Sequence, residues 1–151
     1  MAEFYSLAIM RTVILIALLF LVFSAEASSL DLTNWVRAYP DKRFFDAPQI
    51  KKPLKKMLTP EQWKRLTETY STMSQIQLIQ GHLVAECCLP HDCPAEHAML
   101  VIDLKRNRFH VGFYCGYYQQ KTTIEWISSE GEFYDLPKEV QDEFYHQHNP
   151  R

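Results

Sequence analysis

The sequence predicts an α+β fold, in which a single antiparallel sheet of about five strands is flanked by helices and carries a protruding disulfide-closed loop. Two observations predict it. Apolar residues recur at helical spacing between residues 50 and 70 and again after residue 137, whereas those from 76 to 127 recur with a period of two. Short polar segments separate the strand-like stretches, and strands joined in this way pair antiparallel.

The beginning of the chain has the pattern of a secretory signal peptide. Residues 12–23 form an apolar run that follows Arg11 and leads into small residues at 24–27, where a signal peptidase would cut. The run is shorter than the roughly 20 residues that span a bilayer. We therefore expect a cleaved signal peptide over residues 1–27 and a single exported domain over residues 28–151, without a stable membrane anchor.

The first part of the expected mature chain shows weak helical signals. Residues 28–45 have no long period and predict a lead-in with one short helical turn. Ile50, Leu54 and Met57 then recur at helical spacing among lysines, which we interpret as a solvated face. Pro53 must kink or limit that helix, because proline lacks a backbone N–H.

A second helix begins with a clear capping signal. Thr59 can cap it, Pro60 fits its first position, and Gln62 stands where a capping-box partner belongs. Three apolar residues then line one face, as expected of core packing: Trp63, Leu66 and Tyr70.

The sheet and a closing helix follow. Strands are expected around Ile76, Leu78 and Leu83 and over residues 98–104, 109–118 and 123–127. Polar residues 105–108 and 128–132 predict the turns between and after them. An amphipathic helix is expected over residues 137–146, with Val140 and Phe144 on its apolar face.

Composition excludes several function classes. The formal net charge of -2 argues against binding of nucleic acid, because affinity for nucleic acid rests largely on an excess of Lys and Arg. The glycines, at 81, 112, 116 and 131, fit neither a dinucleotide loop nor a Walker A loop, and the common catalytic signatures GxSxG and HExxH do not occur. We therefore expect no enzyme and no cofactor. Residues 51–65 are basic and residues 125–143 acidic, which either steers a partner or reflects solvated faces.

Four cysteines, at 87, 88, 93 and 115, allow three disulfide pairings in an exported protein. Pairing Cys88 with Cys93 closes a small ring around Leu89, Pro90, His91 and Asp92. So short a ring adds only about 2 kcal/mol of stability, but it makes a rigid loop that loses little entropy on entering a cleft.

The remaining cysteines leave the second bridge open. Cys87 can pair with Cys115 if their strands are neighbours, since vicinal cysteines face opposite sides of a strand. A bridge between Cys93 and Cys115 is the alternative.

The segment 88–93, which reads CLPHDC, stands after an expected strand and before the expected hairpin 98–114. In a small exported α+β protein this motif resembles the inhibitor of vertebrate lysozyme (Ivy) family. The resemblance implies a periplasmic protein of a Gram-negative bacterium that inserts this loop into the active-site cleft of a c-type lysozyme. It also implies that His91 meets the catalytic carboxyl groups and that a homodimer is possible.

The chemistry of the loop fits that role. A retaining glycosidase holds two carboxyl groups about 5 Å apart, and one imidazole has a nitrogen on each side of its ring to bond both. Asp92 is expected to shape the loop through local backbone bonds, and Pro90 to set its presentation. Leu89 stands where the family commonly has Lys, and Cys87 and Cys115 are additional to the family's loop pair.

Other functions compete with this hypothesis. An endogenous lytic transglycosylase is an alternative target, because its cleft also cuts peptidoglycan. From a different class, a zinc or copper site is the rival, although its spacing matches no structural zinc pattern. Its candidate ligands are Cys87, Cys88, His91, Cys93 and His97. A purely structural loop that ties two strands is the third possibility.

Overall fold

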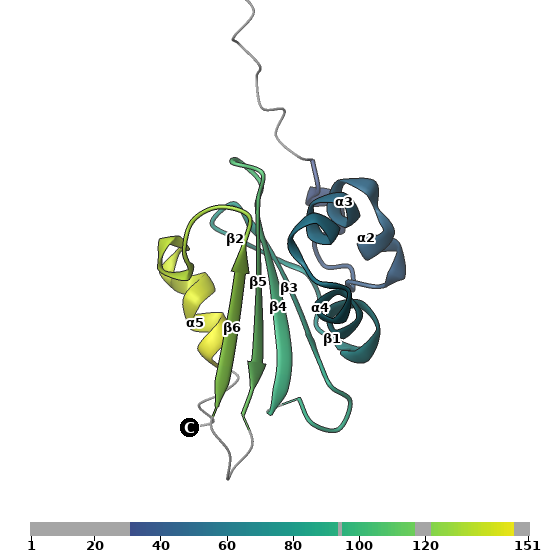
Figure 1. Cartoon of the computed structure of the whole chain (residues 1–151). Helices are drawn as coiled ribbons and strands as arrows, with labels where there is room; N and C mark the ends of the chain where they lie inside the picture. The colour runs from purple at the N-terminus through teal and green to yellow at the C-terminus, as the bar shows by residue number, and fades with distance from the viewer. Residues whose placement is uncertain (1–30, 94, 117–121, 147–151) are drawn as a thin grey trace, which may run out of the picture.

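The structure is a computed structural model that describes residues 31–93, 95–116 and 122–146 (Figure 1). The expected signal peptide, residues 1–27, lies outside the described residues. Within the described part, no helix has the length and apolar character needed to cross a membrane.

Short helices come first in the chain. Their bounds are Thr33–Trp35 (η1, 3-10), Lys42–Asp46 (α2), Pro48–Met57 (α3), Pro60–Lys64 (α4) and a π-helical turn over Arg65–Thr69 (η2). Asp41 caps α2 by accepting hydrogen bonds from the backbone N–H groups of Arg43 and Phe44. Pro53 does not end its helix, because α3 continues beyond it to Met57 with Ile50 and Leu54 buried.

The predicted capping box is present at the start of α4. The Thr59 hydroxyl accepts a hydrogen bond from the Gln62 N–H at 3.2 Å, and the Gln62 side chain accepts one from the Thr59 N–H at 2.8 Å. Two donors that would otherwise lack a partner at the helix start are thereby satisfied.

The strands form one antiparallel sheet with the order β1-β3-β4-β5-β6, in which β2 also pairs with β3. Their bounds are Thr72–Met73 (β1), Gln77–Ile79 (β2), His82–Cys88 (β3), Glu96–Asp103 (β4), Arg108–Cys115 (β5) and Thr123–Ser128 (β6). A 3-10 turn over Phe133–Asp135 (η3) and a helix over Lys138–His146 (α5) follow. The predicted α+β class with a single antiparallel sheet is confirmed.

Helices cover both faces of this sheet. Figure 1 shows α5 on one face and α2, α3 and α4 on the other. Leu100 belongs to the core on the face of α2 to α4, whereas its neighbours Met99 and Val101 belong to the core on the face of α5. Alternate residues of β4 therefore pack into the cores on the two faces of the sheet, which is why the strand is buried along nearly its whole length.

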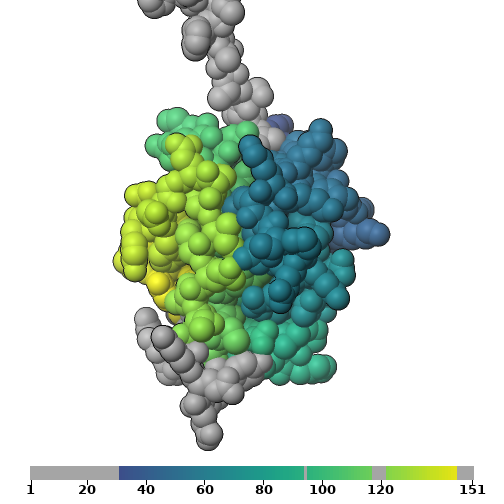
Figure 2. Space-filling view, viewed as in Figure 1, coloured from purple at the N-terminus to yellow at the C-terminus, as the bar shows by residue number. Residues whose placement is uncertain are grey.

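The N-terminal helices and the C-terminal segment meet along the edge of the sheet. In Figure 2 the blue surface of α3 and the green surface of β6 lie side by side on the face turned to the viewer. A groove of about 550 Å³ lies there, lined by Lys52 and Lys56 of α3, by Phe109 and Ser128 of the sheet, and by Ser129, which follows β6.

Candidate functional site

The loop between β3 and β4 is closed by a disulfide. Cys88, the last residue of β3, bonds to Cys93, with the two Cα atoms 4.8 Å apart. This bridge is the ring that the sequence analysis considered first. It encloses Leu89, Pro90, His91 and Asp92 at one end of the sheet, on the side opposite the β4–β5 turn (Figure 1).

A type II β-turn shapes the ring. The Asp92 N–H donates to the Leu89 carbonyl at 3.0 Å, which closes a four-residue turn with Pro90 and His91 in its centre. His91 has a φ of 67°. Proline fixes its own φ near −65°, so only a type II turn combines Pro90 with a positive φ at the next position.

His91 therefore occupies the position that type II turns usually give to glycine. A side chain in this left-handed region costs on the order of 1–2 kcal/mol, although histidine tolerates it better than most residues. The residue is exposed. Backbone and bridge thus display the imidazole at the tip of the loop.

Backbone hydrogen bonds hold the base of the loop to the sheet. The Leu89 N–H donates to the Glu96 carbonyl at 2.9 Å, while the Asp92 carbonyl accepts from the N–H groups of Ala95 and Glu96. The Gly116 N–H then donates to the Ala95 carbonyl at 2.8 Å. The loop is consequently anchored to both β4 and the end of β5, and its expected rigidity has a structural basis.

A partly buried cluster of three polar side chains supports that base from the helical side. Arg65 donates a hydrogen bond to the Tyr70 hydroxyl at 2.7 Å, and this hydroxyl lies 3.1 Å from a Glu96 carboxylate oxygen. The Arg65 guanidinium also lies over the Phe113 ring, at 4.8 Å from its centre. Burial raises the pKa of Tyr70 to about 12 against the opposing effect of Arg65, so the phenol stays neutral and can donate to Glu96.

This Arg65–Tyr70–Glu96 group escaped the sequence analysis, which placed Tyr70 in the core only. No local pattern links residues that are 26 positions apart. The signal that could have found it is the combination of a tyrosine on a buried helical face and a carboxylate at the start of a buried strand, since buried polar groups need partners.

Residues 49–150 match the family described as inhibitor of vertebrate lysozyme (Ivy). The chain belongs to the Ivy family. The matched part includes the disulfide-closed loop and all strands of the sheet. Neither the curated proteins nor the solved structures gave a match. Membership confirms the resemblance seen in the sequence, and it implies a lysozyme inhibitor whose partner is lysozyme.

The second bridge expected for this Ivy-family chain is not formed. Cys87 and Cys115 are both free thiols. Cys87 pairs with Ala98 of β4, and Cys115 pairs with Glu96 of the same strand from the other side. Because β4 separates them and their partners on β4 are two residues apart, their Cα atoms lie more than about 10 Å apart, beyond the roughly 7 Å that a disulfide can bridge. The alternative bridge from Cys93 to Cys115 is also wrong, because Cys93 is bonded to Cys88.

Cys87 has instead become part of the core. Its thiol points toward the carbonyl of Leu66 at 3.6 Å, and burial raises its pKa to about 12. A thiol with so high a pKa carries no thiolate at neutral pH, so it is a poor nucleophile.

The rival metal site does not assemble in this Ivy-family structure. The sulfurs of Cys88 and Cys93 are bonded to each other, and Cys87 faces the helical core. His97 lies on the other face of the sheet, where its ring stacks on Tyr114 at 4.9 Å. Across the residues that the structure describes, no three His, Cys, Asp or Glu side chains are grouped so that they could hold a metal ion.

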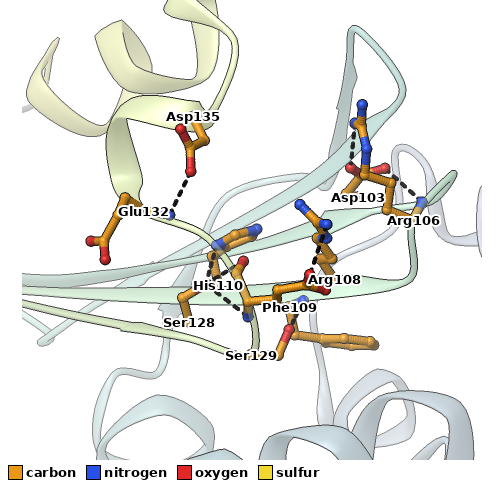
Figure 3. A network of polar contacts seen from close by, with 10 residues as sticks. Asp103, Arg106, Arg108, Phe109, His110, Ser128, Ser129, Glu132 and Asp135 are labelled. Atoms are coloured by element: carbon orange, nitrogen blue, oxygen red, sulfur yellow. Dashed lines mark hydrogen bonds and ion pairs between the residues drawn. The ribbon is translucent and has the colours of Figure 1, made fainter.

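A second polar cluster lies at the opposite end of the sheet (Figure 3). Asp103 accepts hydrogen bonds from the backbone N–H groups of Lys105 and Arg106, both at 3.0 Å, and from the Arg106 side chain at 3.1 Å. Although burial opposes ionisation, these bonds lower the pKa of Asp103. The carboxylate thus caps the β4–β5 turn.

His110 joins β5 to β6 in the same cluster. Its Nδ1 lies 2.8 Å from the Ser128 hydroxyl oxygen. The hydrogen of that hydroxyl is donated to the Glu130 carbonyl at 2.8 Å. Burial, followed by the nearby charge of His82, lowers the pKa of His110. Neither His82 nor His110 has a local signal for this role in the sequence, because the cluster depends on the register between four strands, β3 to β6.

Proposed function

We propose that this protein inhibits a c-type lysozyme by inserting the loop 88–93 into the active-site cleft, with His91 bonded to the two catalytic carboxyl groups. The observation that carries the proposal is the disulfide-closed type II turn with an exposed histidine at its tip. The family match supplies the class of partner.

The geometry of an imidazole suits this role. The carboxyl groups of a retaining glycosidase stand about 5 Å apart, one protonated and one ionised. Imidazole can donate to the ionised group through one nitrogen and bond the protonated group through the other. Since the loop is already fixed by its bridge and backbone bonds, little conformational entropy is lost when it enters the cleft.

Backbone strain at His91 supports the same role. A glycine would adopt a φ of 67° without penalty, yet the chain places a histidine there. Strained residues cluster where the side chain has a function that outweighs the cost. We infer that the imidazole itself, rather than the shape of the turn, is what the loop supplies.

The direct test is lysis of a cell-wall substrate by a c-type lysozyme in the presence of the purified, oxidised protein. We expect stoichiometric inhibition, and a loss of at least tenfold in inhibitory affinity for both His91→Ala and His91→Gly, since two hydrogen bonds to charged or polar groups are removed. Inhibition by either variant at the level of the wild-type protein would contradict the proposal.

Asn107→Ala is the matched control. Asn107 is exposed and also has a positive φ, of 54°, but it lies in the β4–β5 turn at the opposite end of the sheet. Its replacement imposes the same kind of backbone penalty without touching the loop. Inhibition should therefore be unchanged.

The disulfide gives a second test. A Cys88→Ser, Cys93→Ser double variant should remain folded, because so small a ring adds only about 2 kcal/mol to stability. Its loop is no longer pre-organised, so inhibition should weaken while the circular dichroism spectrum stays native-like. An equally strong inhibitor without the bridge would show that pre-organisation is unimportant.

We also propose that residues 1–27 direct export to the periplasm. The apolar run at 12–23 and the small residues that follow it support this location. Mass spectrometry of protein from the periplasmic fraction should give a chain that starts at Ser28. Full-length chain retained in the cytoplasm would exclude export.

A further inference from the structure

A pocket outside the loop has an aromatic lining. It lies between β6, η3 and α5, has a volume of about 330 Å³, and is lined by Trp126, Glu132, Phe133, Tyr134 and Tyr145 among others. We call it the aromatic pocket. Tyr134 is 79% exposed and Tyr145 40% exposed. Both rings contact Phe133 on one side and leave the rest of their surface open to solvent.

Three of the aromatic rings stand nearly at right angles to the ring of Phe133. The ring of Phe133 lies 4.7 Å from that of Trp126 at 75°, and 5.5 Å from that of Tyr145 at 88°. Tyr134 is also 5.5 Å from Phe133, at 76°. The rings of Trp126, Tyr134 and Tyr145 therefore meet Phe133 edge to face rather than in a flat stack.

Charge around the pocket is negative. The exposed Glu132 is the one charged residue among the described residues that line it. Aromatic faces themselves carry partial negative charge. Burial, together with the neighbouring Tyr134, raises the pKa of Tyr145, so its phenol adds hydroxyl polarity without becoming an anion.

These features specify the chemistry of a ligand. Walls of electron-rich rings with one carboxylate attract organic cations, because the cation interacts with the ring faces and its alkyl groups fill the apolar space. An anion would meet repulsion from Glu132. The volume lies at the lower end of the 300–1,000 Å³ that ligand pockets usually have, which fits a headgroup-sized molecule.

We propose that the aromatic pocket binds a small quaternary ammonium ion. Rings from β6, η3 and α5 surround the alkyl groups, and Glu132 at the rim compensates the charge. This site uses none of the loop residues, so it is independent of the proposed inhibition of lysozyme.

Choline and its neutral isostere 3,3-dimethyl-1-butanol are the probes, because they share shape and differ in charge. Binding to the purified, oxidised protein is followed through the indole N–H signal of Trp126 in NMR titrations. We expect choline to bind at least fivefold more tightly than the isostere. Equal affinities for choline and the isostere would show that the pocket recognises only apolar shape, and would overturn the proposal. Binding of N-acetylglucosamine with no binding of choline would overturn it as well.

Variants at the rim test the ring and the carboxylate separately. Tyr134→Leu keeps an apolar side chain but removes the ring, and should weaken choline binding at least threefold, whereas Tyr134→Phe should bind as the wild type does. Glu132→Gln should also weaken choline binding, because it removes the negative charge at the rim. Because Tyr134 is largely exposed, both Tyr134 variants should fold normally. Unchanged binding in Tyr134→Leu would contradict the assignment.

One further variant and one further probe separate this site from other sources of the signal. His91→Gly should bind choline normally, and loss of binding in that variant would place the site at the loop. Nα-acetyl-lysine methylamide keeps the primary ε-ammonium group that lysine side chains present on protein surfaces. Tighter binding of this probe than of choline would overturn the assignment to a small quaternary ion.

Discussion

His91 shows how a single dihedral angle shapes the candidate site. Its φ of 67° places a histidine at the glycine position of a type II turn. The sequence analysis expected a rigid loop with His91 at its tip but did not predict the turn type. Pro90 followed by a non-glycine residue is compatible with other turns, and the positive φ of His91 is what distinguishes type II from type I.

The two replacements of His91 should differ in stability. Both remove the imidazole, but alanine keeps the left-handed penalty and glycine does not. We expect His91→Gly to be more stable than His91→Ala by about 1 kcal/mol. Urea unfolding of both variants measures this difference. Equal midpoints with equal slopes would show that residue 91 is not held at a positive φ in solution.

The two free thiols should differ in reactivity. Cys87 is buried with a raised pKa of about 12, whereas Cys115 is partly exposed at the end of β5. A thiol-specific reagent should therefore modify Cys115 in the folded protein, and both thiols only after denaturation. Peptide mapping identifies the modified residue. If the denatured protein had no reactive thiol, Cys87 and Cys115 would have to be joined in a second disulfide.

At the level of elements, the contact between α5 and the sheet depends on Gly112. A Cβ atom at this position of β5 would come within 2.6 Å of the Trp126 ring and 2.8 Å of the Phe144 ring. The backbone of Gly112 is not unusual, so the requirement is for space. Absence of a side chain lets β6 and α5 approach the middle of β5 together.

Gly112→Ala should accordingly destabilise the protein by about 1–3 kcal/mol, because the rings have to shift. The near-ultraviolet circular dichroism spectrum should change as well, since Trp126 and Phe144 move. Gly81→Ala is the control. A Cβ at Gly81 meets nothing within 4 Å, although its φ of 78° is strained. That variant should lose stability but keep the aromatic spectrum.

Elements with a local signal were the ones that the sequence predicted well. The capping box at Thr59 and Gln62 needs only four consecutive residues, and it is present. The ring between Cys88 and Cys93 also closes over a short stretch. The pairing of Cys87 with Cys115 failed because it depends on which strand lies between theirs, and alternation of side chains says nothing about strand order.

At the level of the whole molecule, the two ends of the sheet have different chemistry. The disulfide-closed loop lies at one end, and the polar cluster around Asp103 and His110 lies at the other (Figures 1 and 3). The first end presents a side chain outward, whereas the second end holds the buried carboxylate of Asp103 and the buried imidazole of His110 in hydrogen bonds with neighbouring residues.

That stability should fall in mildly acidic solution. Burial holds the pKa of His110 below its ordinary 6.5, with Asp103 and Asp135 opposing the effect of His82 and Arg108. Because the unfolded chain then binds a proton more readily, the contribution of His110 is fully present above about pH 6.5 and is lost as the pH falls toward its folded pKa. Asp103, whose pKa is lowered from 3.8, remains ionised throughout this range.

Urea unfolding at pH 7.5 and pH 5.5 measures the effect. The wild-type free energy of unfolding should be lower at pH 5.5, and His110→Gln should reduce the difference, since an amide keeps a hydrogen bond to Ser128 without titrating. If the free energy of unfolding of His110→Gln depended on pH as that of the wild type does, another group would be responsible for the effect.

The neighbouring positions of Cys87 and Cys88 have a consequence for how the chain becomes oxidised. In an unfolded chain both thiols are close enough to compete for Cys93, and exchange among them is open to any thiolate. Folding removes one competitor, because Cys87 enters the core between the sheet and the helices while Cys88 stays at the loop. The fold thus acts as a selection step for the correct bridge. Chains that oxidise after β3 has packed carry the right loop at once, and chains that oxidise earlier must reshuffle before Cys87 can be buried.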